Sequence, residues 1–213
     1  MDPARAVRLS SSLPGPCRGA HDMYFWIDGA WLDAEQARIP VLDHGLLYGD
    51  GIFEGIRCRA GHPFRLHRHL DRLERSAAAL RLRGNETRTR IEAVCHAMAG
   101  RLGDGYLRLI VTRGDGDLGV DPGSCPRART ILIGGAIAVT DDAARTRGAR
   151  LITSSVRRPG PAATEARIKS LNYLPSVLAR LEARAAGADE ALLLNDAGRV
   201  AEASAENVLC VHG

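Results

Sequence analysis

The sequence is poor in lysine, in aromatic residues and in long apolar segments. Of its 29 basic residues, 28 are arginines and one is a lysine, and aromatic residues make up only 4% of the 213 residues. No apolar run approaches the roughly 20 residues that a membrane-spanning helix needs. No basic stripe with interleaved aromatics accompanies the formal net charge of +4. We therefore expect a soluble protein whose partners are neither membranes nor nucleic acids.

Cysteines are few, and their spacing matches no disulfide or zinc-binding motif. There are five, without a C-x-x-C pair: Cys17, Cys58, Cys95, Cys125 and Cys210. This pattern argues against a disulfide framework and a zinc site, and it indicates a reducing, cytoplasmic compartment. Residues 1–22 lack the apolar core of a secretory signal and are typical of a disordered leader. We expect natural translation to start at Met23.

Apolar and β-branched runs predict eight strands, and apolar residues at helical spacing predict three helices. The predicted strands cover residues 24–27, 39–42, 52–58, 105–112, 130–139, 150–156, 190–195 and 206–211, and the predicted helices cover 66–80, 91–102 and 174–185. Thr87 is a candidate cap for the second helix. The polar segment 140–148 is the best candidate for an interdomain linker. The pattern predicts an α/β (α+β) chain with a small domain at 23–139 and a second domain at 149–213.

Two patterns resemble ligand sites but do not fit the chemistry. Residues 114–119 match G-x-G-x-x-G after a predicted strand, yet Pro122 and Pro126 follow where a helix would have to begin to hold a pyrophosphate. The aspartates of this segment lack the glutamate that completes a calcium loop. His67 and His69 are two residues apart, so on a helix they point to different sides and do not chelate one metal. We expect a flexible loop at 114–119, surface or interface histidines, and no metal site.

Lys169 is the one residue whose chemistry arginine cannot replace. A lysine amine can lose its proton and attack a carbonyl carbon, whereas a guanidinium stays protonated at any working pH. Chance alone can also leave a single lysine on a surface. However, Lys169 lies between a predicted strand and a predicted helix, which places its amine at the mouth of a sheet-and-helix unit.

Four segments in one order resemble the fold-type-IV pyridoxal phosphate enzymes, and among these the branched-chain amino acid aminotransferases most. They are DHGLLYGDGIFEGIR (43–57), RLHRHLDRLERSA (65–77), KSLNYL (169–174) and EASAEN (202–207). The resemblance implies a two-domain enzyme, with a small N-terminal α/β domain and, from 149 onward, the first part of a large, barrel-like cofactor-binding domain. It also implies a homodimer or a higher homo-oligomer.

The resemblance gives four residues a role toward pyridoxal 5'-phosphate. Lys169 would form the Schiff base and later shuttle a proton on the substrate. Glu202 would lie beside the pyridine nitrogen and keep it protonated. Arg72 would bind the phosphate with its planar fork, and Tyr173 would hydrogen-bond the phenolic oxygen of the cofactor.

The same resemblance implies a set of substrate-binding residues. Those within one subunit are Phe53, Gly55, Arg57, Tyr106 and Arg108, while Tyr48 would reach the site of a neighbouring subunit. The 113–122 loop, with its apolar Leu118 and Val120 and without a histidine, is similar to the loop of branched-chain enzymes. The implied reaction is transamination of branched-chain L-amino acids with 2-oxoglutarate as the amino acceptor.

The sequence departs from the family pattern in two ways. Ala203 and Ala205 stand where glycine is frequent, and either methyl group would crowd a close backbone approach. The chain also ends before the phosphate-binding turn and the threonine-rich loop of the family, so we expect weak cofactor binding at best. Three alternatives remain: an aminodeoxychorismate lyase, a D-amino-acid aminotransferase, and a non-catalytic fragment or interaction protein.

Overall fold

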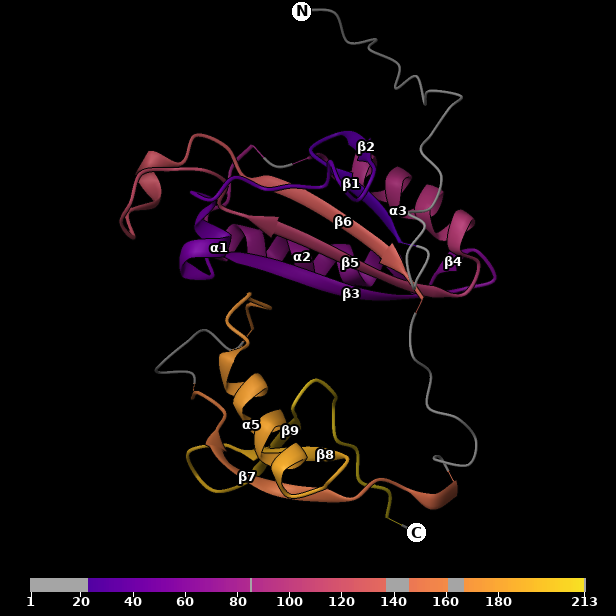
Figure 1. Cartoon of the computed structure of the whole chain (residues 1–213), viewed down its shortest axis with the longest axis vertical. Coiled ribbons are helices and arrows are strands. Elements are labelled where there is room, and N and C mark those ends of the chain that lie inside the picture. The colour runs from indigo at the N-terminus through magenta and orange to yellow at the C-terminus, as the bar shows by residue number, and fades with distance from the viewer. Residues whose placement is uncertain (1–22, 85, 137–145, 161–166, 213) are drawn as a thin grey trace, which may run out of the picture. The chain divides into compact units, whose positions relative to one another are not determined.

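The computed structural model describes residues 23–84, 86–136, 146–160 and 167–212 (Figure 1). The chain divides into two compact units, residues 1–137 and 138–213, which are described separately below. The expected leader at 1–22 and most of the predicted linker at 140–148 lie outside the described residues. Within the described part of the chain, every helix is too short or too polar to cross a membrane.

The first unit is built on a six-stranded sheet in which all neighbouring strands are antiparallel. The strand order is β2-β1-β6-β5-β3-β4. The strands are β1 (Tyr24–Ile27), β2 (Ala30–Leu32), β3 (Gly51–Arg59), β4 (His62–Pro63), β5 (Gly105–Thr112) and β6 (Arg129–Gly135). The long central pair, β3 with β5, keeps one register from Gly51↔Thr112 to Cys58↔Gly105. This pair gives the unit its regular centre.

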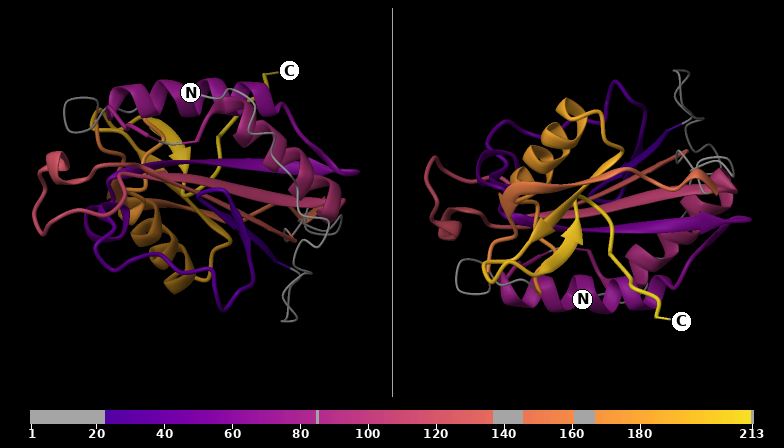
Figure 2. Two further views of the ribbon diagram at one scale, coloured as in Figure 1. Left: turned by 90° about the horizontal axis from the view of Figure 1, so that it is seen from above. Right: turned by 90° about the horizontal axis from the view of Figure 1, so that it is seen from below.

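Two long helices, α2 (Leu66–Ala79) and α3 (Arg88–Leu102), cover one face of this sheet (Figure 2). Their buried residues recur at helical spacing, as Leu66, Leu70 and Leu73 do on α2. The predicted cap is confirmed, because the Thr87 hydroxyl accepts a hydrogen bond from the main-chain N–H of Arg90. Two short elements complete the unit: α1 (His44–Tyr48) and the 3-10 turn η1 (Pro122–Ser124).

The second unit is a βαβ arrangement followed by a hairpin. Strand β7 (Leu151–Arg157) pairs in parallel with β8 (Glu190–Leu194), and α5 (Leu174–Ala185) supplies the crossover that parallel pairing requires. Strand β9 (Val200–Ala203) then pairs antiparallel with β8. The core is small, because the fully buried residues that α5 contributes are alanines, Ala179 and Ala183.

The structure confirms the α/β class and most predicted elements, but two predicted strands are wrong. The described residues 39–42 and 206–211 form no strand, and their large apolar side chains are exposed, from Ile39 at 37% to Val211 at 91%. Strand β9 was missed because a turn, rather than an apolar run, fixes its position. Gly198, at φ +74°, closes the turn and Val200 begins the strand. The short elements β2, β4 and α1 are too brief to show periodicity.

The core of the second unit depends on one large side chain. Leu193 is 1% exposed and packs against the alanines of α5. Leu193→Ala should lower the free energy of unfolding by about 2–5 kcal/mol, measured by urea unfolding followed by circular dichroism. Leu178→Ala is the matched control, because Leu178 is 44% exposed on α5 of the same unit. Equal losses from both variants would contradict this account of the core.

Candidate active site

Strand β3 carries two different sets of side chains on the two faces of the first sheet. Successive residues of a strand point to opposite faces, and residues paired across antiparallel strands point to the same face. Glu54 contacts helix α2, so Ile52, Glu54 and Ile56 face the helices. Phe53, Gly55 and Arg57 therefore face the other way.

The structure brings five of the predicted substrate residues together on the face that the helices leave free. Gly55 pairs with Arg108 and Arg57 pairs with Tyr106 across β3 and β5, so these side chains share a face with Phe53. The Arg108 guanidinium stacks 3.5 Å from the centre of the Phe53 ring. Two cationic groups and two aromatic rings thus form one compact surface.

Gly55 makes room for the Tyr106 side chain on this surface. A Cβ atom at Gly55 would collide with the Tyr106 hydroxyl, and it would lie 2.8 Å from the ring carbon that bears this hydroxyl. Since real Cβ atoms do not approach so closely, any side chain at position 55 would move Tyr106. Glycine is needed at position 55 because the Tyr106 side chain passes close to the backbone there, and not because the backbone turns.

Arg72 lies on the helix face and is bound by a buried carboxylate that the sequence analysis did not select. Its Nε and Nη2 donate to Glu54 at 2.6 and 2.5 Å, and His69 Nδ1 donates to the same carboxylate at 2.8 Å. The Glu54 side chain is 1% exposed, while that of Arg72 is 43% exposed. A glutamate between apolar strand residues was the only available sign of this cluster. His69 was expected at a surface or interface and is instead a partner of Glu54.

Two opposing effects act on the pKa of Glu54. Burial alone would raise the pKa, because it disfavours the charged form. The hydrogen bonds and charges of Arg72 and His69 outweigh burial, and they lower the pKa below its usual value of 4.5. The carboxylate is therefore ionised at neutral pH and holds one edge of the Arg72 guanidinium.

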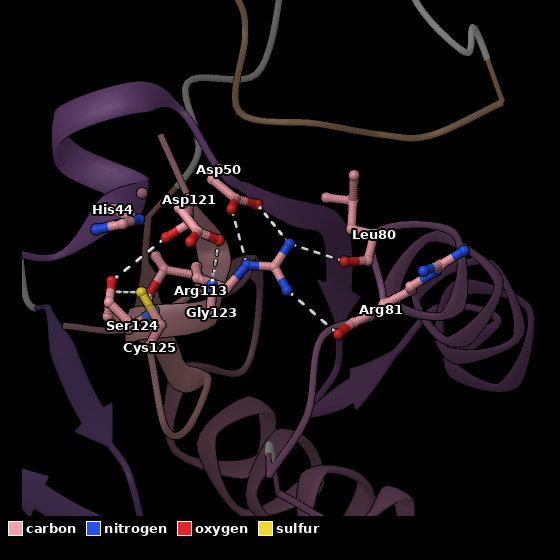
Figure 3. A network of polar contacts seen from close by, with 12 residues as sticks. His44, Asp50, Leu80, Arg81, Arg113, Asp121, Gly123, Ser124 and Cys125 are labelled. Carbon is pink, nitrogen blue, oxygen red and sulfur yellow. Dashed lines mark hydrogen bonds and ion pairs between the residues drawn. The ribbon is translucent and has the colours of Figure 1, made fainter. Parts of the chain in front are cut away.

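Tyr48 lies at the end of α1 and contacts the 113–122 loop. Its hydroxyl accepts a hydrogen bond from the N–H of Gly119 at 2.7 Å. The loop begins at Arg113, whose guanidinium binds both oxygens of Asp50 at 2.8 and 3.1 Å and donates to the carbonyls of Leu80 and Arg81 (Figure 3). The 113–122 loop, which contains the expected flexible segment 114–119, is thus anchored at Arg113.

Lys169 and Tyr173 are brought together in the second unit. The Lys169 Nζ donates to the Tyr173 hydroxyl at 3.1 Å. Tyr173 is the residue before α5, and Lys169 lies four residues earlier in the segment that leads into this helix. Glu202, on β9, forms a 2.6 Å ion pair with Arg158 Nε. Arg158 is a partner of the site that the sequence analysis missed.

The two alanines that replace frequent family glycines differ in their surroundings. Ala203 is 5% exposed, and its N–H donates to the carbonyl of Glu206. Ala205 is exposed. Only the methyl group of Ala203 therefore occupies buried space next to Glu202.

A family model identifies the family to which the chain belongs. Residues 51–213 match the model described as amino-transferase class IV, and the chain belongs to this family. It is 44% identical over 193 residues to a Methanocaldococcus jannaschii protein provisionally named branched-chain-amino-acid aminotransferase, covering 89% of this chain and 65% of the relative.

Two solved structures show the same fold. The T.th. branched-chain amino acid aminotransferase with pyridoxamine 5'-phosphate aligns with a TM-score of 0.77 and 36% identity, over 85% of this chain and 62% of that one. The 4-amino-4-deoxychorismate lyase from Pseudomonas aeruginosa aligns with a TM-score of 0.73 and 36% identity, over 85% and 64% of the two chains. The chain thus spans just under two thirds of the length of these proteins.

The Glu54 cluster makes a specific prediction about stability. Glu54→Gln should lower the free energy of unfolding by about 1–3 kcal/mol at neutral pH, because the variant loses the charge that binds two donors. A lowered pKa in the folded state stabilises the fold above pH 4.5, and this contribution is lost as the pH falls through the folded value. The difference between wild type and variant should therefore shrink below pH 4.5.

Urea unfolding at several pH values measures this difference. Glu92→Gln is the control, since Glu92 forms a half-exposed pair with Arg88 and should show little change at any pH. A difference for Glu54→Gln that stays constant from neutral pH to well below pH 4.5 would refute the proposed ionisation.

Proposed function

We propose that this chain carries the catalytic lysine of an aminotransferase that uses pyridoxal 5'-phosphate and transfers the amino group of branched-chain L-amino acids to 2-oxoglutarate. One observation carries the proposal. Lys169 is the only lysine of the sequence, and its Nζ lies 3.1 Å from the Tyr173 hydroxyl, in a chain of the class IV amino-transferase family. When bound, the cofactor supplies an aldehyde that captures amines and a ring that withdraws electrons.

The candidate cofactor residues fit this chemistry. Lys169 offers a primary amine that can act as a nucleophile and then move a proton at the substrate α-carbon. Tyr173 holds the lysine Nζ at a fixed distance with its hydroxyl oxygen. Glu202 supplies a carboxylate for the pyridine nitrogen, and the Arg158 guanidinium holds this carboxylate in place. Arg72, in the first unit, supplies a guanidinium suited to the phosphate oxygens.

The first unit also supplies groups that could recognise a substrate. Arg57 and Arg108 form no ion pair with any residue that the structure describes, so their guanidinium groups can bind the carboxylates of an amino acid or of 2-oxoglutarate. Phe53 and Tyr106 give the same surface an apolar part. The exposed Leu118 and Val120 suit a branched aliphatic side chain, and Tyr48 would serve the site of a second subunit in a homodimer.

An aminodeoxychorismate lyase is the second candidate. The solved lyase is as similar in sequence as the solved aminotransferase, at 36% identity, with a slightly lower TM-score. Both reactions need the same lysine. They differ in the product, because a lyase releases pyruvate and an aminotransferase releases an amino acid and a 2-oxo acid. The 113–122 loop has no histidine, which argues against D-amino acids.

Cofactor capture tests the role of Lys169. Incubation with excess pyridoxal 5'-phosphate followed by borohydride traps even a weakly bound cofactor, and peptide mass spectrometry should locate the reduced pyridoxyl group on Lys169. Lys169→Ala should abolish both this label and amino-group transfer, because no other side chain of the sequence offers a primary amine. Tyr173→Phe is the control that keeps the amine. Labelling of the α-amino group alone in wild type would overturn the proposal.

Product analysis decides between the reactions. With leucine and 2-oxoglutarate, the proposal expects glutamate and the branched 2-oxo acid. Pyruvate from aminodeoxychorismate, without glutamate formation, would replace the aminotransferase by the lyase. If the chain captures the cofactor but forms neither product, the cofactor site is supported and both reactions are refuted.

Gly55 gives a prediction for substrate binding. Gly55→Ala should displace Tyr106 from the surface that it shares with Arg108 and raise the KM for leucine about tenfold or more, because the added methyl group occupies the position of the tyrosine hydroxyl. Steady-state kinetics of the holoenzyme measure this. The double variant Gly55→Ala with Tyr106→Phe removes the colliding hydroxyl and should recover part of the loss. No recovery would indicate that the methyl group acts elsewhere.

A further inference from the structure

His44 is a buried histidine that none of the proposed roles uses. It is 1% exposed and begins α1, four residues before Tyr48. Burying an imidazole is costly unless its polar atoms find partners. An apolar residue would fill such a space without this requirement, so the contacts of His44 indicate what the ring does.

The ring of His44 binds the middle of the 113–122 loop. Its Nε2 lies 2.9 Å from the carbonyl oxygen of Asp117. A carbonyl oxygen only accepts hydrogen bonds, so Nε2 carries a hydrogen and donates it. The main-chain N–H of His44 also donates to the carbonyl of Gly114 at 2.9 Å. One residue thus holds the loop at two points.

The same ring packs against Tyr48. The two ring centres are 5.0 Å apart and the planes are perpendicular, which is a favourable edge-to-face arrangement. Tyr48 in turn accepts the N–H of Gly119 with its hydroxyl at 2.7 Å. His44 and Tyr48 therefore form, with the loop, a closed set of contacts at Gly114, Asp117 and Gly119.

The loop approaches His44 too closely for a side chain at position 116. A Cβ atom at Gly116 would lie 2.9 Å from His44 Nε2 and 2.6 Å from the Ser124 hydroxyl. Figure 3 shows His44 beside Ser124 and Cys125, with Arg113 anchored to Asp50 nearby. The 113–122 loop is therefore held at Arg113 by Asp50 and at its centre by His44. Ser124, which lies just after the loop, also holds it, because its hydroxyl accepts a hydrogen bond from the N–H of Asp117.

Two apolar side chains of this anchored loop remain in solvent. Leu118 is 78% exposed and Val120 is 81% exposed, and they flank Gly119. Apolar side chains on a free loop would collapse onto the nearest apolar surface. Here the polar contacts on either side fix the backbone, so the two side chains stay presented beside Tyr48.

We propose that His44 is a positioning residue that holds Tyr48, Leu118 and Val120 as one preformed apolar surface, and that the discrimination between branched aliphatic and acidic side chains, which the proposed function assigns to this surface, depends on the hydrogen bond of His44. The inference rests on the proposed function for its second part only. The first part concerns the free protein and stands on the contacts of the first unit.

Three variants separate the hydrogen bond of His44 from its bulk. His44→Phe keeps an aromatic ring against Tyr48 and removes the donor. His44→Gln restores an N–H donor of similar reach. Gly116→Ala leaves His44 intact and pushes the loop away from it. His96→Phe is the matched control, because His96 is exposed on α3 and no hydrogen bond of the described chain joins it to the loop.

Amide hydrogen exchange of the 114–120 peptide, in the full chain without ligands, tests the first part. Exchange should become about 3–10-fold faster in His44→Phe and Gly116→Ala, the change expected from losing one hydrogen bond. It should stay near the wild-type rate in His44→Gln and His96→Phe. Unchanged exchange in both His44→Phe and Gly116→Ala would overturn the positioning role.

The ratio of kcat/KM for leucine to that for glutamate, as amino donors with a common 2-oxo acid, tests the second part. The ratio should fall about 3–10-fold in His44→Phe, again the effect of one hydrogen bond, and recover in His44→Gln, whereas a merely structural change would lower both values together. An unchanged ratio with altered exchange would refute the role in selectivity. Absence of any amino-group transfer in wild type would refute the proposed function, and with it the selectivity, while hydrogen exchange still decides the positioning role.

Discussion

The alternation of side chains along β3 is the constraint on which the first unit depends. Successive residues of a strand point to opposite faces. Here one face forms the core and the other forms the proposed substrate surface. Ile52, Glu54 and Ile56 are buried on the face covered by the helices, while Phe53, Gly55 and Arg57 lie with Tyr106 and Arg108 on the other face. A shift of register by one residue would exchange these sets. It would place Arg57 under the helices and expose the core, so the pairing of β3 with β5 fixes both the fold and the proposed substrate surface.

Glu54 belongs both to the buried core of the first unit and to the cluster that orients Arg72. It sits in the apolar row of β3, where an uncompensated charge would be costly, and the cluster with Arg72 and His69 supplies the compensation. The carboxylate in turn orients a guanidinium that is still 43% exposed. A solvated arginine side chain samples many rotamers, and the two hydrogen bonds to Glu54 reduce this freedom for Arg72. The buried charge therefore stabilises the first unit and also orients Arg72, the residue proposed for the cofactor phosphate.

The sequence predicted the parts of the molecule in which local pattern and tertiary structure agree. The long central strands, the two covering helices, α5 and the Thr87 cap follow from periodicity and capping, which need no knowledge of distant residues. The partners Glu54 and Arg158 were out of reach, because each is defined by a contact across 18 or 44 positions of the chain. The strand predicted at 206–211 failed for a related reason. Its apolar residues, Val208 and Leu209, have no pairing strand among the described residues and remain exposed.

Arginine and lysine serve different purposes in the two units. Arg72, Arg113 and Arg158 each hold a carboxylate through Nε, which suits a planar group that never loses its proton. Lys169 instead donates from Nζ to a hydroxyl, that of Tyr173. The contact with Tyr173 therefore fixes the distance between the amine and the phenol, whereas the three arginines anchor carboxylates.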